Sequence, residues 1–330
     1  MATLKDVAAL ACVDVSTVSR ALNNTSYVHP DTKKRIYAAA KELGYHPNIM
    51  AKALRQGKRH TIGVVVPRLQ TTIFAEILQG IETYARDHGY GTLICVTDDK
   101  AKNERDCLNR LRNGFVDGII IAATGRNGRL IRDIKASGIS VVQVVRRQEY
   151  HISCVDADFE ACGYDAVEYL YHKGCRNIGL IAGAQHLYPY KGRYDGYKKA
   201  IRQYELSEYV SECSYDVNSF EYGLECANQL LDNVPDLDAI IACVDIQGLG
   251  ALRAIKEAEK DYQTVRVLSL TGHQIGAMLQ TSMTSMEMPA YEMGTKAAQM
   301  IIEDIAAPDN QKSGIQHLTV NAILKERETT

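Results

Sequence analysis

The sequence predicts an α/β protein, in which a small N-terminal all-α head precedes a body of two doubly wound parallel-sheet units. Residues 3–46 contain only short helical patterns and tight turns. From Thr61 onward, short apolar runs rich in β-branched residues alternate with helical stretches, and the alternation restarts after Asp156. The length of 330 residues fits two or three domains, and 46% hydrophobic residues are typical of a folded chain.

Three helices are expected in the head. The first follows Thr3 and carries apolar residues at helical spacing. The second opens near Asp14 and Ser16, either of which can cap it. The third covers residues 31–43 and stops at Gly44, because glycine is typical of helix C-termini.

The body consists of short apolar runs that suit parallel strands buried on both faces. In its first half the expected strands are residues 62–66, 92–96, 118–122 and 140–145. In its second half they are residues 178–182, 239–243 and 265–270. The expected helices include residues 74–88, 159–172, 192–205, 219–232 and 246–259. This alternation predicts helices on both faces of each sheet.

The net charge of −2 conceals an uneven distribution. Residues 1–60 carry ten Lys/Arg against four Asp/Glu, a balance of +6, which leaves −8 on the rest of the chain. A basic head on an acidic body is expected when only the head meets a polyanion such as nucleic acid. An uneven surface that is merely solvated would give the same charges.

The nine cysteines are scattered, and none forms a Cys-x-x-Cys pair, which predicts reduced thiols in a cytoplasmic protein. The sequence shows no signal peptide and no apolar run of membrane-spanning length. It also contains no nucleotide-binding loop, nucleophile elbow or zinc spacing, so we expect no enzyme, no cofactor and no metal. The acidic pair Asp98-Asp99 is interpreted as a turn or a solvated loop at a strand end.

The first two helices fit a helix-turn-helix. The second would direct Val15, Ser16, Ser19 and Arg20 outward, and a DNA major groove accepts one helix whose short polar groups and arginine reach the base edges. Thr32, at the start of the third helix, is placed to hold a phosphate. Any three-helix bundle with polar outer faces would give the same pattern.

Four motifs in order resemble the lactose-repressor/galactose-repressor (LacI/GalR) family of bacterial transcription regulators. They are Thr3-Leu-Lys-Asp-Val-Ala8, Val15-Ser-Thr-Val-Ser-Arg-Ala-Leu-Asn23, Leu43-Gly-Tyr-His-Pro-Asn48 and Thr61-Ile-Gly-Val-Val-Val-Pro67. The resemblance implies a DNA-binding head over residues 1–46, a hinge helix and linker over 47–60, and an effector-binding and dimerisation domain over 61–330. This domain is similar to periplasmic sugar-binding proteins. Its two subdomains are expected at about 61–155 with 288–319, and at about 156–287 with 320–330.

The resemblance also implies which residues contact DNA. In the hinge, Ala51 and Leu54 would enter the minor groove, where an apolar wedge unstacks a base step. A helix of nine residues is too short to be stable alone, so it is expected to order only on operator DNA, beside its twin in a homodimer. The residues expected to contact DNA are Thr3, Val15, Ser16, Thr17, Ser19, Arg20, Asn23, Tyr27, His29, Thr32, Asn48, Ala51 and Leu54.

Two residues in the turn of the head depart from the family pattern. Cys12 stands where the family usually has glycine, and Asp14 stands where it usually has serine. Asp14 can still cap the second helix, but its charge is expected to weaken binding to phosphate.

By position in the family, the effector would bind in the cleft between the subdomains. The residues expected there are Arg68, Thr71, Ile73, Phe74, Arg146, Arg193, Asp245 and Thr271. Three acceptors that the family usually has are absent, because Val145, Val244 and Thr271 stand in their places. Basic residues crowd the same loops, which favours a sugar phosphate, somewhat as in the trehalose-repressor branch. A neutral di- or oligosaccharide remains an alternative.

The predicted function is that of a sequence-specific transcriptional repressor of a carbohydrate-utilisation operon. It would act as a homodimer on pseudo-palindromic operator DNA under the control of a sugar or sugar phosphate. One alternative is a global carbon-catabolite regulator that docks a protein co-regulator. Another is a sugar-binding protein or an enzyme with the same fold.

Overall fold

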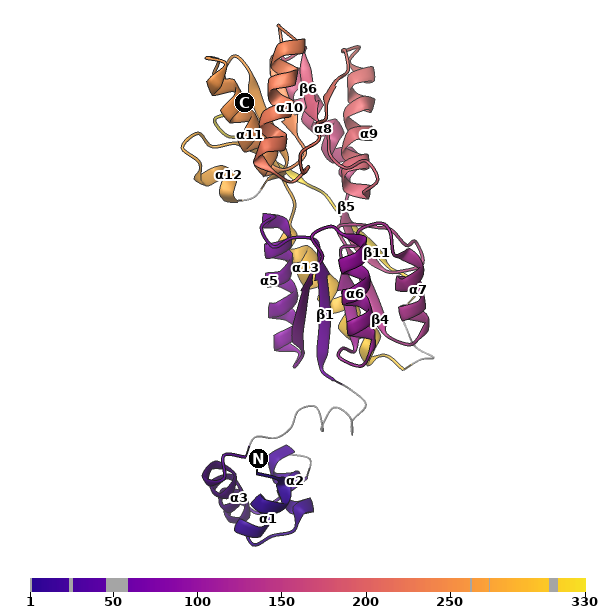
Figure 1. Ribbon diagram of the computed structural model, residues 1–330, viewed down its shortest axis with the longest axis vertical. Coiled ribbons are helices and arrows are strands. Elements are labelled where there is room, and N and C mark those ends of the chain that lie inside the picture. The colour runs from indigo at the N-terminus through magenta and orange to yellow at the C-terminus, as the bar shows by residue number, and fades with distance from the viewer. Residues whose placement is uncertain (1, 24–25, 46–58, 262, 273, 309–313) are drawn as a thin grey trace. The chain divides into compact units, whose positions relative to one another are not determined.

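The N-terminal part of the chain consists of three helices around a small apolar core. The computed structural model describes residues 2–23, 26–45, 59–261, 263–272, 274–308 and 314–330, and its two compact units are Met1–Arg59 and His60–Thr330 (Figure 1). In the first unit, α1 (Leu4–Leu10), α2 (Val15–Asn23) and α3 (Pro30–Glu42) bury Val7, Val18 and Ile36 between them. Gly44 follows α3 with a φ of +58°, as expected for a residue that ends a helix.

The first sheet of the second unit is parallel throughout, in the order β11-β5-β4-β3-β1-β2. Along β1, Ile62, Val64 and Val66 join the core beneath α5 and α13, whereas Val65 joins the core beneath α6 and α7. Both faces are therefore covered, as a parallel sheet requires. The bounds are β1 (Thr61–Val66), α5 (Thr72–Asp87), β2 (Gly91–Val96), α6 (Ala101–Arg112), β3 (Gly118–Ile121), α7 (Gly128–Ala136), β4 (Ser140–Val144), β5 (Cys154–Ala157), α13 (Ala290–Ala306) and β11 (His317–Val320).

The second sheet has the order β12-β10-β9-β8-β6-β7, and only its edge strand β12 runs antiparallel among the described strands. The core that includes Leu180 and Leu268 contains side chains of α8 and α9, whereas Ile181 and Ile240 pack with α10 and α11. The bounds are α8 (Phe159–His172), β6 (Ile178–Ile181), α9 (Tyr188–Gln203), β7 (Tyr209–Ser211), α10 (Phe220–Asn233), β8 (Ala239–Ala242), α11 (Asp245–Glu257), β9 (Arg266–Gly272), α12 (Gln274–Met278), β10 (Thr284–Glu287) and β12 (Ile323–Lys325). The predicted fold class is confirmed.

The chain passes between the two sheets three times, so each subdomain is built from separate stretches of sequence. The first passage follows Ala157, the last residue of β5, two residues beyond the expected boundary at Val155-Asp156. The second lies between β10 and α13, and the third between β11 and β12. The first sheet thus receives α13 and β11, and the second receives β12, from the last part of the chain.

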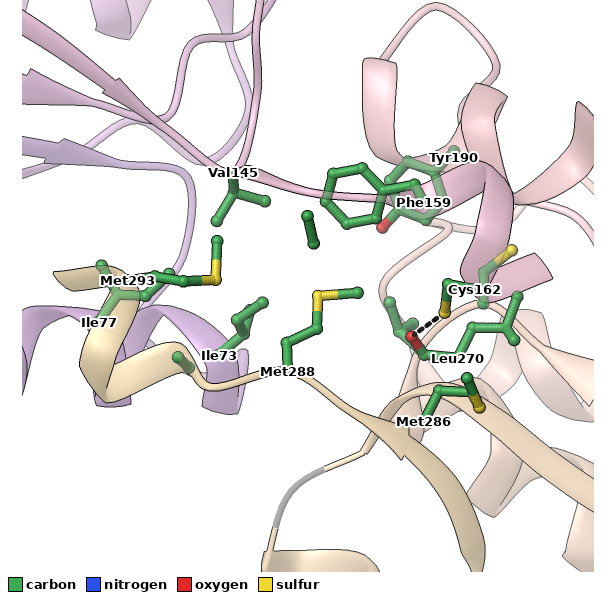
Figure 2. Close-up of a cluster of buried hydrophobic side chains, with 14 of the residues drawn as sticks. Ile73, Ile77, Val145, Phe159, Cys162, Tyr190, Leu270, Met286, Met288 and Met293 are labelled. Atoms are coloured by element: carbon green, nitrogen blue, oxygen red, sulfur yellow. Dashed lines mark hydrogen bonds between the residues drawn. The ribbon is translucent and has the colours of Figure 1, made fainter. Parts of the chain in front are cut away.

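A buried apolar seam joins the two subdomains (Figure 2). Figure 2 shows Met288, which lies on the second passage, between Ile73 of α5 on one side and Leu270 of β9 on the other. Ile73, Leu270 and Met288 are all at most 4% exposed. Because methionine is flexible and polarisable, it fills an irregular gap between two rigid layers. The subdomains therefore share one continuous core.

Candidate functional site

Helix α2 presents a polar face to solvent and an apolar face to the core of the first unit. Val18 and Ala21 are buried against α1 and α3, whereas Val15, Ser16 and Arg20 are exposed. Because helical residues four apart share a face, Ser16 and Arg20 lie one above the other. This geometry leaves short polar groups and one arginine free to reach the edges of bases.

The other predicted residues of α1 and α2 make local bonds. Thr3 caps α1: its Oγ1 accepts a hydrogen bond from Asp6 N at 3.4 Å, and its N donates to Asp6 Oδ2 at 2.7 Å. These bonds lower the pKa of the Asp6 carboxyl. Asn23 Nδ2 donates to Ser19 O at 2.8 Å, and Thr17, Ser19 and Asn23 are half-buried beside the exposed face of α2.

The remaining predicted DNA contacts fall around the start of α3 and in the hinge. Tyr27 and His29 are exposed, and Thr32 is half-buried in the first turn of α3, where backbone N–H groups favour an anion. Asn48, Ala51 and Leu54, together with the rest of the expected hinge helix, lie outside the described residues.

The turn between α1 and α2 has an unusual backbone at Cys12. Its φ is +52°, a left-handed conformation that L-residues rarely take outside glycine, asparagine and aspartate. This explains why the family pattern has glycine at this position. The exposed thiol of Cys12 therefore sits on a strained turn beside α2.

In the second unit, a narrow cavity of about 30 Å³ lies between the two subdomains. The carboxyl ends of parallel strands meet on both of its sides, as expected for a ligand site in this class of fold. The first subdomain contributes Pro67, Arg68, Thr71, Ile73, Phe74, Asp99, Val145 and Arg146. The second contributes Pro189, Tyr190, Arg193, Asn218, Val244 and Thr271.

Seven of the eight residues predicted for the cleft line this cavity, and Asp245 does not. Asp245 starts α11 and accepts a hydrogen bond from Ser269 Oγ at 2.7 Å, which turns its carboxylate toward β9. Its second oxygen is buried without a hydrogen-bond partner among the described residues, and burial raises the pKa of the Asp245 carboxyl to about 7. Thr271 lines the cavity, with its Oγ1 bonded to Cys243 O at 2.9 Å.

Arg146 is held by a carboxylate that sequence reasoning had placed in a turn. Its Nη1 and Nη2 donate to Asp99 Oδ1 at 2.5 Å and to Oδ2 at 3.1 Å, and its guanidinium lies 5.8 Å from the ring centre of Phe74. Asp98 and Asp99 do form a turn, with φ values of +52° and +55°. However, Asp99 is part of the cavity wall and not only a solvated loop. Its place at the carboxyl end of β2 was the available signal.

Arg193 is the buried cation of the opposite wall. Its side chain is 3% exposed, Nη1 donates to Cys243 O at 3.2 Å, and Nε has no hydrogen-bond partner among the described residues. The guanidinium lies 5.0 Å from the ring centre of Phe159 and 5.9 Å from that of Tyr190. A buried N–H without an acceptor costs free energy, so this Nε is a natural donor to a ligand.

Arg68 reaches from the first subdomain to the second. Its Nη2 donates to Asp216 Oδ2 at 2.6 Å, which joins the loop after β1 to the loop before α10. The Nε of Arg68 is also buried without a hydrogen-bond partner among the described residues. In the second subdomain, Tyr190 OH donates to Asn218 Oδ1 at 2.8 Å, and burial raises the pKa of Tyr190 to about 12.

The expected excess of free basic groups in the cleft is only partly present. Arg68 pairs with Asp216, Arg146 with Asp99, Arg147 with Asp156 and Lys191 with Asp195. Of these cations and Arg193, Arg193 alone has no carboxylate at ion-pair distance within the described part of the chain. Asp216 and Asp99 lie 148 and 47 residues from their arginines in the sequence, so the sequence pattern gave no sign of these two pairings.

Two further properties of the described residues bear on function. Among their helices, none combines the length and the apolar character that a membrane span requires. Nor do their His, Cys, Asp and Glu side chains form a group of three or more that suits a metal ion.

Comparison with known sequence families gives two matches that together cover most of the chain. Residues 3–48 match the bacterial regulatory proteins of the lacI family, and residues 59–327 match the periplasmic binding proteins and sugar binding domain of the LacI family. The first match covers the three helices of the head, and the second covers both sheets and the cavity between them.

Individual proteins agree with these matches along the whole chain. The ribose operon repressor of Halalkalibacterium halodurans is 29% identical over 92% of this chain and 91% of its own length. The structure of the transcriptional regulator CelR in complex with cellobiose is 26% identical and covers all of both chains, with a TM-score of 0.75. The structure of the Lac repressor dimer bound to operator and the anti-inducer ONPF has a TM-score of 0.87 at 23% identity, over 100% of this chain and 99% of that one, and shows the shared fold.

Proposed function

This chain belongs to the LacI family of bacterial regulatory proteins, and we propose that it is a DNA-binding transcriptional repressor of a carbohydrate-utilisation operon. The observation that carries the proposal is the exposed face of α2 on a separate helical unit. Val15, Ser16 and Arg20 would read base edges in the major groove, while Thr17, Ser19 and the start of α3 would hold phosphates.

A sugar or sugar phosphate in the cavity of the second unit would control the repressor. The cavity offers apolar surface from Phe74 and Ile73, which suits a sugar ring, and donors from Arg68 and Arg193, which suit hydroxyl or phosphate oxygens. A ligand that binds one arrangement of the subdomains more tightly shifts the population toward it, and the change in affinity for DNA follows by linkage.

A homodimer would place two heads on the halves of a pseudo-palindromic operator. The edge strand β2 supports this proposal. No other described strand pairs with its outer edge, and Leu93, Ile94 and Val96 are exposed on it, so an apolar surface would otherwise face water. We assign no catalytic step to the protein, and as an operator-binding regulator it would act in the cytoplasm.

The test is a titration of fluorescent promoter DNA, taken from the operon beside the gene, with the full chain. Arg20→Ala should weaken specific binding by about 1–3 kcal/mol, because an arginine bidentate to guanine contributes that much. Lys41→Ala, which removes an exposed cation from the last turn of α3, is the matched control and should change binding little.

Two outcomes would contradict the proposal: equal losses in Arg20→Ala and Lys41→Ala, or no binding by the unmodified chain. Adding ribose, cellobiose and their phosphates to the bound complex then tests the effector, since at least one of them should change the affinity for the promoter.

A further inference from the structure

We propose that Asp216 is a specificity-determining residue. Its carboxylate occupies an oxyanion-binding subsite at Arg68, and an anionic group of the effector must displace this carboxylate in order to bind there. The inference rests on the proposed function of the cavity as an effector site. One end of the ligand would therefore carry a phosphate ester or a carboxylate.

The ion pair between Arg68 and Asp216 bridges the two subdomains. Arg68 lies directly after β1 in the first subdomain, and Asp216 lies in the loop before α10 in the second. The 2.6 Å contact between Nη2 and Oδ2 is on the rim of the cavity, since Arg68 lines it and Asp216 does not. The pair therefore links the two subdomains beside the cavity.

Asp216 satisfies Arg68 only in part. Its Oδ2 accepts from Nη2, while its Oδ1 accepts from the backbone N of Asn218 at 3.0 Å within the same loop. Because this turn fixes the carboxylate, the contact to Arg68 is a single bond. The Nε of Arg68 stays buried without a hydrogen-bond partner in the described structure. A free oxyanion can accept from Nη2 and Nε together, which is the favourable bidentate geometry for a guanidinium.

The charges lining the cavity also favour an anion. The lining contains three arginines and one carboxylate, Asp99, which is bound to Arg146 through both oxygens. Once a ligand displaces Asp216, both Arg68 and Arg193 have buried donors that no described protein group accepts. Phe74 and Ile73 lie on the same wall and leave apolar surface for the body of the ligand. An oxyanion joined to a less polar ring or chain fits this arrangement.

Asp216 could compete with the ligand for Arg68, or it could simply clamp the two subdomains together. These two roles predict opposite effects of removing its charge on anion binding. If Asp216 competes with the ligand for Arg68, its removal tightens binding of anions. If Asp216 only holds the subdomains together around the ligand, its removal weakens binding. Asp216→Asn separates the two, because the asparagine Oδ1 still accepts from Asn218 N and keeps the turn while the negative charge is lost.

The experiment is isothermal titration of the full chain, without DNA, with inorganic phosphate, glucose 6-phosphate, glucuronate and glucose. Asp216→Asn should bind at least one of the three anions about fivefold more tightly than the unmodified chain, the competition expected from a partly exposed ion pair. Glucose affinity should not change. The anion that gains most identifies the ligand group as phosphate or carboxylate.

Asp195→Asn is the matched control. Asp195 lies in the same subdomain, pairs with Lys191 at 2.5 Å and is 44% exposed in its side chain, against 46% for Asp216. It changes the net charge equally, and neither Asp195 nor its partner Lys191 lines the cavity, so it should leave every affinity within about twofold. In the double variant Arg68→Gln with Asp216→Asn, the gain should vanish because the subsite is gone.

Three results would overturn the proposal: no gain for any anion, an equal gain in Asp195→Asn, or an equal gain for glucose. Weaker anion binding by Asp216→Asn would establish the clamp instead. Because the titration contains no DNA, it can be interpreted even if the protein does not bind its operator. The proposal for Asp216 and the proposed function can therefore fail separately.

Discussion

Besides the Asp98-Asp99 turn, two residues take a left-handed backbone at functional positions. Cys12 does so in the turn before α2, and Val145 does so in the cavity wall, where Arg146 N donates to Val144 O at 2.6 Å across a three-residue turn. A β-branched residue with a φ of +64° is rare, and such strain persists only when the surrounding structure fixes it. At Val145 the strain sets the direction of Arg146, which follows immediately and meets Asp99.

Replacing Cys12 by glycine should stabilise the head. The φ of +52° disfavours any residue with a Cβ, so Cys12→Gly should raise the free energy of local unfolding by about 1 kcal/mol. Hydrogen exchange of the α1 and α2 amides in the full chain measures this change. Cys12→Ala is the control, because it removes the thiol but keeps the Cβ. An equal gain in both variants would attribute the effect to the thiol and not to the backbone.

Asp245 should make folding stability depend on pH. Burial raises the pKa of its carboxyl from 3.8 to about 7, so the folded state binds a proton more readily than the unfolded state between these values. Its contribution to stability therefore falls as pH rises from about 4 to about 7, and is constant above that range.

Asp245→Asn cannot ionise and still accepts from Ser269 Oγ. The difference in urea midpoint between Asp245→Asn and the unmodified protein should be larger, in favour of the variant, at about pH 8 than at about pH 5. A difference that stays constant with pH would contradict the burial argument.

At the scale of elements, three helix pairs cross at glycines. In each pair a glycine on both helices lets the backbones approach, since an added Cβ would lie within 2.6 Å of the partner's backbone. The glycines are Gly80 and Gly294 for α5 and α13, Gly163 and Gly196 for α8 and α9, and Gly223 and Gly250 for α10 and α11. Two of these pairs join neighbours in the sequence, whereas α13 comes from the far end of the chain to meet α5.

Gly294→Ala should destabilise the first subdomain by about 1–3 kcal/mol, the usual cost of overpacking. The new Cβ would lie 2.1 Å from Ile77 O, a backbone atom that cannot move without shifting α5. Urea unfolding measures the loss. Gly314→Ala is the control, because no atom lies within 4 Å of its added Cβ. Equal midpoints for the two variants would exclude the crossing as the cause.

The sequence predicted the apolar strand runs and most helices, but missed α6, α7 and α13 together with several short strands. The β-branched runs became strands within one or two residues, and the head helices appeared where the apolar spacing placed them. Helix α6 was not assigned, because its sequence is dominated by charged and amide residues around a narrow apolar stripe. The strands β7, β10 and β12 have only three or four residues each, too few to show a period.

For the cavity, the family resemblance supplied most of the lining but not its pairings. Position at a strand end locates Arg68 and Thr271, because parallel strands end on one edge of the sheet. The carboxylates that hold Arg68 and Arg146 lie 148 and 47 residues away in sequence, so only the folded chain brings them together. The basic residues alone therefore overstated the free positive charge of the cleft.

At the scale of the whole molecule, the unpaired edge β2 should decide the oligomeric state. Ile94→Asp places a charge in the centre of the exposed apolar strand, where Ile94 is 48% exposed. We expect this variant to be a monomer in sedimentation experiments at concentrations where the unmodified chain is a dimer. Binding to a two-site operator should weaken accordingly.

Ile315→Asp is the control for that variant. Ile315 is 47% exposed and precedes β11, at the opposite edge of the same sheet, so the change in polarity and charge is the same. This control should remain a dimer. A dimer in both variants would show that β2 is not the interface, and a monomer in both would show that added charge alone causes dissociation.

The return of the chain to both sheets has a consequence for biosynthesis. β11 pairs with β5 and β12 pairs with β10, while α13 covers a face of the first sheet. A chain emerging from the ribosome therefore holds β1 to β5 with one face partly bare until about 150 further residues, up to the end of α13, have been made. Contacts so distant in sequence form slowly and leave apolar surface exposed meanwhile. Nascent chains of this protein should consequently depend on chaperones until residues 317–325 are free to join both sheets.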